Sequence, residues 1–264
     1  MTNSSLTTDL RSGELGARLA EIAVEASRVI LPYWRNDAVV TSKPDESPVT
    51  EADHAAEALI LERLRVLYPD VPVVAEEAMA GGADPGDLGR RFFLVDPLDG
   101  TRGFVAGRES FAVNIGLVED GRAVAGAIAA PAMGVVWHTG PEGALRRRFD
   151  DAQATPVRVR ERPVAGGVAL LSHSLADDAA ERLASRHGCV AWQGMDSAIK
   201  FCLIAEGRFD VYPRLGRTME WDTAAGEAIL AAAGGRLVAE TGGPMAYGKA
   251  AVGFENPGFT ALGG

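Results

Sequence analysis

The chain is poor in cysteine and in histidine. Only two cysteines, Cys189 and Cys202, and four histidines occur among its 264 residues. Neither residue type shows the paired spacing of a zinc site, and two cysteines do not make a disulfide framework. A reducing, cytoplasmic location is therefore expected.

Long apolar runs and an excess of positive charge are also missing. The longest apolar stretch, residues 123–137, is broken by Pro131 and is shorter than the roughly 20 residues of a membrane span. Residues 1–16 have no apolar core, so no signal peptide is expected. With 36 acidic residues against 26 lysines and arginines, the net charge is −10, which argues against a nucleic-acid polymer as partner. It does not argue against a small phosphorylated substrate, because carboxylates bind Mg²⁺ and the metal attracts phosphate.

The periodicity of apolar residues predicts a mixed chain of helices and strands in two parts. The first part has expected helices at 15–34 and 51–67, a loop at 36–48, a buried strand at 92–95 and a strand meander over 110–138. A polar, arginine-rich segment at 140–163, with weak strand signals, is the candidate boundary. Beyond it, expected strands at 167–171, 189–192, 209–212 and 236–240 alternate with helices at 176–186, 197–205 and 223–233. This alternation indicates an α/β layer, and we expect domains of residues 1–162 and 163–264.

Carboxylates stand at the ends of several of these elements. Asp96 and Asp99 follow the buried strand, with Pro97 between them, and they can point at one location. Asp96-Pro97 and Asp99-Gly100 are also common turn dipeptides. Further acids occupy strand or helix edges, namely Asp53, Glu76, Glu77 and Asp222. Carboxylates brought close together repel one another, and Mg²⁺, which prefers their oxygens, would resolve that repulsion.

The residues after Asp99 are suited to a phosphate. Gly100 allows the backbone to approach a ligand closely. A helix that starts near Thr101 would direct its free N–H groups to the same location, where they would hold phosphate oxygens.

Four short segments, in this order along the chain, resemble the motifs of the inositol monophosphatase superfamily of Mg²⁺-dependent, lithium-sensitive phosphatases. They are Thr-Glu-Ala-Asp at 50–53, Glu-Glu at 76–77, Asp-Pro-Leu-Asp-Gly-Thr at 96–101 and Trp-Asp-Thr-Ala-Ala-Gly at 221–226. The resemblance implies an α/β (α+β) fold, the layered αβαβα sandwich of the inositol monophosphatases and sugar phosphatases. Further stretches are similar to the 3′(2′),5′-bisphosphate nucleotidases of the CysQ type, at 111–115, 172–173, 197–202, 205–207, 212–214 and 256–257. Those enzymes cleave adenosine 3′,5′-bisphosphate to AMP and phosphate.

The resemblance also implies a role for each matching residue. The metal ligands would be Glu76, Asp96, Asp99, Asp222 and the backbone oxygen of Leu98, around two or three Mg²⁺ ions. The catalytic group would be Asp53, Glu76 and Thr101, of which Thr101 and Asp53 would orient the attacking water. The substrate contacts would be Gly100, Thr101, His173, Ser197, Lys200, Arg214 and Asp222.

Two departures from the nucleotidase pattern put the substrate in question more than the reaction. Gly103 follows Arg102 where an acid is common, and Leu171 precedes Ser172 where an arginine is common. A phosphatase for inositol 1-phosphate or a related sugar phosphate is the nearest alternative, and a non-catalytic protein that binds a phosphorylated ligand is a second. We expect no membrane partner, and a monomer or a homodimer.

One further segment is similar to a nucleotide-binding loop. Residues 243–250 (Gly-Pro-Met-Ala-Tyr-Gly-Lys-Ala) are one residue short of a P-loop, and Ala250 lacks the hydroxyl that would hold Mg²⁺. Pro244 and Tyr247 favour a turn, so no triphosphate site is expected here.

Overall fold

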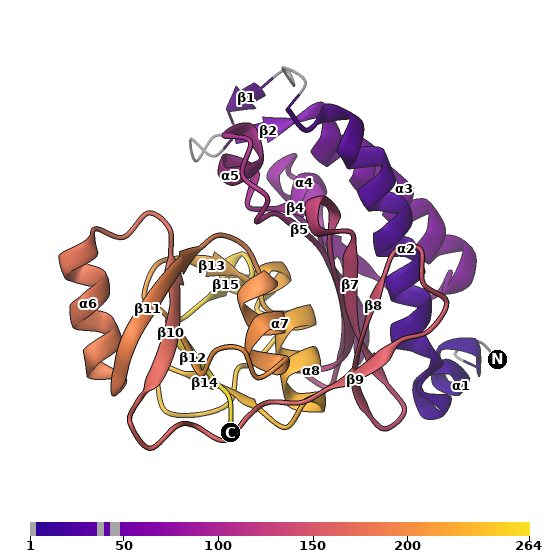
Figure 1. Cartoon of the computed structure of the whole chain (residues 1–264). Coiled ribbons are helices and arrows are strands. Elements are labelled where there is room, and N and C mark those ends of the chain that lie inside the picture. The colour runs from indigo at the N-terminus through magenta and orange to yellow at the C-terminus, as the bar shows by residue number, and fades with distance from the viewer. Residues whose placement is uncertain (1–3, 36–39, 43–47) are drawn as a thin grey trace.

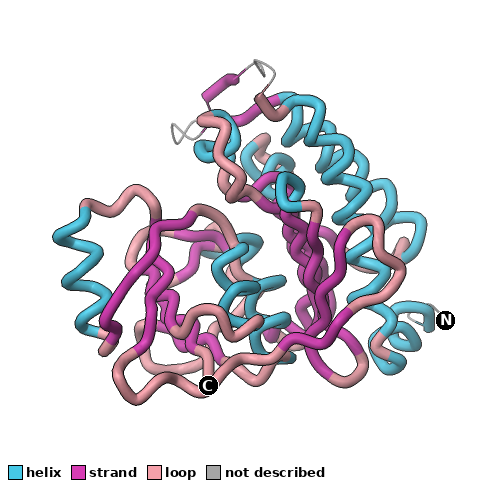
Figure 2. Tube along the Cα trace, in the orientation of Figure 1, coloured by secondary structure: helices cyan, strands magenta, loops and turns pink. Residues whose placement is uncertain are grey.

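The computed structural model describes residues 4–35, 40–42 and 48–264. Its elements lie in five layers: helices, a seven-stranded sheet, helices, a five-stranded sheet and a last helix, as Figure 1 shows. In Figure 2 the two groups of strands are seen on either side of a central pair of helices. The expected αβαβα sandwich is confirmed.

The first layer contains α1 (Ser4–Ser12), α2 (Glu14–Ile30) and α3 (Glu51–Leu67). The sequence did not predict α1, and it predicted that α2 would continue to residue 34. Instead α2 ends at Ile30 and a 3₁₀ turn, η1 (Leu31–Tyr33), follows, because Pro32 has no N–H to donate to the preceding helical turn. The expected loop at 36–48 contains β1 (Val40–Ser42), paired with β2 (Pro48–Thr50); its other residues before Pro48 lie outside the described ranges.

The seven-stranded sheet has the order β3-β4-β5-β6-β7-β8-β9. Only β3 and β4 pair in parallel, and every later pair is antiparallel, so the predicted meander is confirmed. The strands are β3 (Val73–Ala75), β4 (Arg91–Asp99), β5 (Ala112–Glu119), β6 (Arg122–Ala130), β7 (Val135–Gly140), β8 (Gly143–Arg148) and β9 (Thr155–Val157).

The arginine-rich segment at 140–163 is largely part of this sheet. Its residues form β8 and β9, which extend the meander beyond the expected boundary. The arginines of β8 form ion pairs with acids of the helical layers on the two sides of the sheet. Arg146 pairs with Glu206, directly after α7 (Ile199–Ala205), at 2.8 Å, and Arg147 pairs with Glu21 of α2 at 2.5 Å.

The five-stranded sheet has the order β11-β10-β12-β16-β14. The first three strands are parallel, and β16, which was not predicted, inserts antiparallel between β12 and β14. The strands are β10 (Gly167–Ser172), β11 (Cys189–Met195), β12 (Val211–Arg214), β14 (Arg236–Ala239) and β16 (Phe259–Leu262). The helices of this half are α6 (Asp177–Arg186), α7 (Ile199–Ala205) and α8 (Ala224–Ala232).

Helices α7 and α8 lie between the sheets and join the two halves through one core. A single buried cluster includes Phe92 and Ile128 of the first sheet together with Phe201 and Ile229 of these helices. The approach of α8 to β6 is close: a Cβ at Gly126 would lie 2.7 Å from a backbone atom of α8. The division at 162/163 stays a prediction about folding units, while the packing here is continuous across it. Among the helices of the described ranges, none has both the length and the apolar character needed to cross a membrane.

Candidate active site

The end of β4 brings two of the expected carboxylates together. Its pairing with β5 is interrupted between Asp96 and Asp99, where Pro97 cannot donate a ladder hydrogen bond. Asp96 accepts a hydrogen bond from the Leu98 N–H at 3.0 Å, and Asp99 accepts one from the N–H of Ala198 in the other half. The interruption therefore takes Pro97 and Leu98, which lie between the two carboxylates, out of the β4–β5 register.

A turn and a short helix follow directly. Gly100 has φ +90°, a conformation that favours glycine, and α5 (Thr101–Val105) starts at the next residue. The condition for holding phosphate oxygens here, a helix that starts near Thr101, is thus met.

Glu76 lies directly after β3, at the same edge of the sheet. It is the first residue of α4 (Glu76–Ala80), which follows β3, and β3 is parallel to β4. The carboxylate of Glu57 accepts hydrogen bonds from the N–H groups of Glu77 at 2.8 Å and Ala78 at 2.9 Å, and so fixes the start of α4. Sequence reasoning missed Glu57. The signal was its place on the buried face of α3, in the i, i+4 position from Asp53, where a charged residue is unusual.

Asp53 is buried at the start of α3, only 1% exposed. Its Oδ2 accepts hydrogen bonds from the Thr50 N–H at 2.8 Å and the Thr50 hydroxyl at 2.6 Å. Its Oδ1 accepts one from the Thr101 hydroxyl at 3.4 Å, and that hydroxyl also lies 3.0 Å from the Leu98 carbonyl oxygen. Asp53 is therefore both a helix cap and the partner of Thr101.

Asp222 reaches the carboxylates of β4 from the second half. It ends the 3₁₀ turn η3 (Glu220–Asp222), and its Oδ2 accepts a hydrogen bond from the Met219 N–H at 2.7 Å. Burial raises the pKa values of Asp96, Asp99 and Asp222, and the charges of neighbouring acids, Glu76 among them, raise them further. The four acids therefore share one electrostatic environment, in which ionising all of them is costly.

A hard cation fits this donor set. The donors are carboxylates and a backbone carbonyl, the oxygen ligands that Mg²⁺ prefers. A cation would offset the repulsion that adds to the effect of burial on the three pKa values. Within the described ranges, no three acidic, histidine or cysteine side chains already lie at metal-binding distances. Asn114, opposite Asp96 in the β4–β5 register, is buried beside them, and its amide atoms have no hydrogen-bond partner of normal geometry. The amide oxygen and nitrogen of Asn114 thus keep hydrogen-bonding capacity that a ligand or a metal-bound water could use.

A hollow of about 460 Å³ opens in front of these carboxylates, between the two halves. It is lined by Glu76, Asp99, Gly100, Thr101, Arg102, Gly103, Arg108, Ser172, His173, Ser174, Asp196, Ser197, Lys200 and Arg214. Eight of the expected site residues line it, and Asp53, Asp96, Leu98 and Asp222 do not. Acidic and basic groups thus share one cavity.

The expected substrate contacts differ in their exposure and in the hydrogen bonds that they already make within the protein. His173 is exposed at the end of β10, so it is not a core histidine. Lys200 is only 3% exposed, and its ammonium donates to the carbonyls of Met195 at 3.1 Å and Ser197 at 2.6 Å. Burial lowers the pKa of Lys200 to about 8. In this structure Lys200 holds the backbone around Ser197, and a direct substrate contact stays a prediction for it.

Arg108 and Asp196 were not foreseen. The Arg108 Nε–H donates to Asp196 Oδ2 at 2.8 Å across the hollow, although the residues are 88 positions apart and no sequence pattern connects them. A Cβ at Gly103 would lie 3.0 Å from the same Asp196 oxygen. The acid that is absent at position 103 therefore has a spatial counterpart in Asp196, supplied by the other half.

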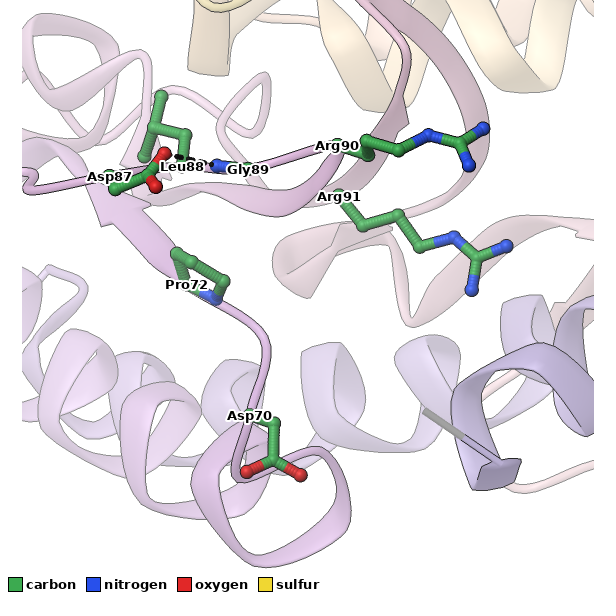
Figure 3. A pocket seen from close by; sticks show the side chains of 7 residues that line it. All are labelled: Asp70, Pro72, Asp87, Leu88, Gly89, Arg90 and Arg91. Carbon is green, nitrogen blue, oxygen red and sulfur yellow. Dashed lines mark hydrogen bonds between the residues drawn. The ribbon is translucent and has the colours of Figure 1, made fainter. Parts of the chain in front are cut away.

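Another hollow, of about 360 Å³, is lined by Asp70, Pro72, Asp87, Leu88, Gly89, Arg90 and Arg91 (Figure 3). Both of its arginines have carboxylate partners: Arg90 pairs with Asp120 and Arg91 with Glu119, each at 2.5 Å. Its two acids, Asp70 and Asp87, are exposed, so the described residues that line this hollow include arginines but lack the buried carboxylates that would bind a metal beside a phosphate.

The model of the inositol monophosphatase family matches residues 14–261 of the chain. The 3′(2′),5′-bisphosphate nucleotidase CysQ of Escherichia coli (strain K12) is 39% identical over 220 residues, 83% of this chain and 87% of that protein. The protein of the same name from Buchnera aphidicola is 34% identical over 248 residues, 92% of each chain.

Solved structures agree with these similarities. The crystal structure of CysQ from Bacteroides thetaiotaomicron, a bacterial member of the inositol monophosphatase family, has a TM-score of 0.76 and 29% identity, over 95% of this chain and 97% of that one. The inositol monophosphatase of Anabaena has a TM-score of 0.73 and 27% identity, over 98% and 92%.

Proposed function

The chain belongs to the inositol monophosphatase family, and from this premise we propose that it is a Mg²⁺-dependent 3′(2′),5′-bisphosphate nucleotidase. Its substrate is adenosine 3′,5′-bisphosphate, and its products are AMP and phosphate. The observation that carries this proposal is the hollow, which has Glu76 and Asp99 on its wall together with Arg102, Arg108 and Arg214. A bisphosphate needs a site for each phosphate. Here the scissile phosphate would lie beside the metal-binding carboxylates, and the other phosphate would lie beside the guanidinium groups.

The residues that would hold Mg²⁺ are Glu76, Asp96, Asp99, Asp222 and the carbonyl of Leu98. Two or three ions there would lower the pKa of a bound water and neutralise charge on the phosphate. The protein adds N–H groups at the start of α5, where Gly100 and Thr101 would hold the phosphate oxygens.

Thr101 and Asp53 would position the attacking water. Because the Asp53 Oδ2 is occupied by two bonds from Thr50, its Oδ1 is directed to the Thr101 hydroxyl. A water that donates to Thr101 can thus pass a proton toward Asp53 without a histidine. The water oxygen attacks phosphorus and the bond between phosphorus and the 3′-oxygen breaks. The proton of the attacking water leaves through Thr101 and Asp53, and the leaving 3′-oxygen takes a proton from a second water.

The test is phosphate release from three substrates, each with Mg²⁺ and with a chelator. They are adenosine 3′,5′-bisphosphate, adenosine 3′-monophosphate and inositol 1-phosphate, and lithium is added in a parallel series. We expect Mg²⁺-dependent release, inhibited by lithium, with the highest kcat/KM for the bisphosphate. A higher kcat/KM for inositol 1-phosphate would favour a sugar-phosphate phosphatase, and no release from any substrate would favour a binding protein. The cytoplasmic location and the monomeric or homodimeric state stay predictions.

A further inference from the structure

The segment similar to a P-loop is fastened to the turn that carries Asp222. Residues 246–256, which we call the anchor loop, include most of that segment, η4 (Ala250–Val252) and β15 (Glu255–Asn256). Glu220, two residues before Asp222, is fully buried at 0% exposure. Its carboxylate accepts hydrogen bonds from the Gly248 N–H at 2.7 Å, the Lys249 N–H at 2.8 Å and the Lys249 ammonium at 2.7 Å. All three donors come from the anchor loop.

Lys249 connects this ion pair to the other side of the turn. Its ammonium also donates to Asn256 Oδ1 at 3.2 Å. The Asn256 amide in turn donates to the Met219 carbonyl at 2.6 Å and to the Thr223 hydroxyl at 3.0 Å. The residues immediately before and after η3 are therefore both held by the amide that Lys249 contacts.

The network ends at the carboxylate of Asp222. The Met219 N–H donates to Asp222 Oδ2 at 2.7 Å, and the Met219 carbonyl accepts from Asn256. The backbone of η3 is held as well, because the Glu220 N–H donates to the Phe254 carbonyl at 2.9 Å. A shift of the anchor loop would thus move the Met219 backbone and the Asp222 side chain together.

We propose that Lys249 is a positioning residue that, through Glu220 and Asn256, places the Asp222 carboxylate for metal binding. The inference rests on the proposed function, because it takes Asp222 to be a metal ligand. A buried ion pair contributes little net stability compared with apolar packing, whereas groups that orient a metal ligand control its affinity. A P-loop-like lysine in this fold would therefore act on the metal site through protein groups, and not by binding a nucleotide triphosphate.

The experiment measures Mg²⁺ binding to the metal-free full chain by isothermal titration calorimetry. Lys249→Met keeps an unbranched side chain as long as the four methylenes of lysine and removes the ammonium, while Lys249→Arg keeps the cation. We expect Mg²⁺ affinity to fall about 10- to 100-fold in Lys249→Met and to stay within about threefold of the parent in Lys249→Arg. The matched control is Arg217→Met, which breaks the exposed pair of Arg217 with Glu255 of the same loop, at 3.3 Å, and leaves Lys249, Glu220 and Asn256 in place. The Mg²⁺ affinity of this variant should not change.

Asn256→Leu keeps the Lys249–Glu220 pair and removes the amide that holds Met219. Its Mg²⁺ affinity should fall as in Lys249→Met, and it serves as the test should the lysine variant not fold. A parent-like Mg²⁺ affinity in the folded variants, together with a lower Tm, would show a merely structural role and overturn the proposal. Equal weakening in Lys249→Arg and Lys249→Met would also overturn it. Absence of Mg²⁺ binding by the parent chain would instead contradict the proposed function.

Discussion

The Thr101 hydroxyl donates a hydrogen bond to Asp53, 48 residues earlier, at 3.4 Å, and the first residue of α5 thus meets the first turn of α3 at a polar pair. If this pair orients the attacking water, Thr101→Val should lower kcat about 100- to 10,000-fold. The KM and the Mg²⁺ dependence should change little, because the carboxylates of β4 remain. Steady-state phosphate release checks this. Thr101→Ser, which keeps the hydroxyl, should retain most activity, and an equal loss in both variants would contradict the role of the hydroxyl.

Asp99→Asn should abolish turnover while the fold remains. The carboxylate is half-buried and accepts a hydrogen bond from the Ala198 N–H, which the amide oxygen of asparagine can still accept, so local packing survives. Loss of a metal ligand removes several kcal/mol of transition-state stabilisation, about a thousandfold or more in kcat/KM. Circular dichroism and phosphate release measure the two effects.

The control for this variant is Asp120→Asn, which breaks the exposed ion pair with Arg90. Neither residue lines the hollow in front of the carboxylates. It should keep parent activity. Near-parent activity of Asp99→Asn would remove Asp99 from the metal site.

The metal-free protein should lose stability as the pH rises. The pKa of Asp96 is raised in the folded state, chiefly by burial and then by the neighbouring acids. Between the unfolded and folded pKa values the folded chain binds more protons, so this contribution is full below about pH 4 and is lost at higher pH. Thermal melts in a chelator at several pH values measure the decline, and saturating Mg²⁺ should reduce it.

Asp96→Asn isolates that contribution, because asparagine does not ionise. We expect the metal-free Tm of this variant to fall less as the pH rises above about 4, because the parent must lose the Asp96 proton that its folded state holds and asparagine has none to lose. A steeper fall than in the parent would contradict the assigned direction of the shift.

Arg108→Gln should affect a bisphosphate more than a monophosphate. Arg108 lines the hollow and uses its Nε–H for Asp196, and an arginine has four further N–H donors for a phosphate. Hydrogen bonds between charged groups contribute about 1.5–3 kcal/mol, so KM for adenosine 3′,5′-bisphosphate should rise about tenfold or more. KM for adenosine 3′-monophosphate should stay constant, and Arg90→Gln in the other hollow should change neither. Equal increases for both substrates would remove Arg108 from second-phosphate binding.

Local sequence was sufficient to predict much of the fold. The helix at 51–67, the buried strand before Asp96 and the meander of β5 to β7 each depend on neighbouring residues, and the structure has all three. The end of α2 was predicted too late, although Pro32 carried the signal. Strand β8 was unclear because its arginines interrupt the apolar pattern, and the acid that pairs with Arg146, Glu206, is distant in the chain. Strand β16 was missed, and it pairs with β12, which lies far earlier in the chain.

The same distinction applies to the candidate site. The carboxylates of β4 follow one another in the sequence, so their convergence could be predicted. Arg108 and Asp196 meet only through tertiary packing, and the link from Lys249 to Asp222 crosses the Glu220 turn and β15. Such contacts have no periodicity or spacing that a single sequence could reveal.

The continuous core has a consequence for protein engineering. Glu76, Asp96 and Asp99 precede residue 162, Asp222 follows it, and α8 of the second segment packs on the first sheet. Two separately expressed fragments, cut at 162/163, would each expose an apolar face and hold an incomplete set of acids. Phosphate release would then appear only after the fragments associate, which makes this chain a candidate split reporter for the proximity of two fused proteins.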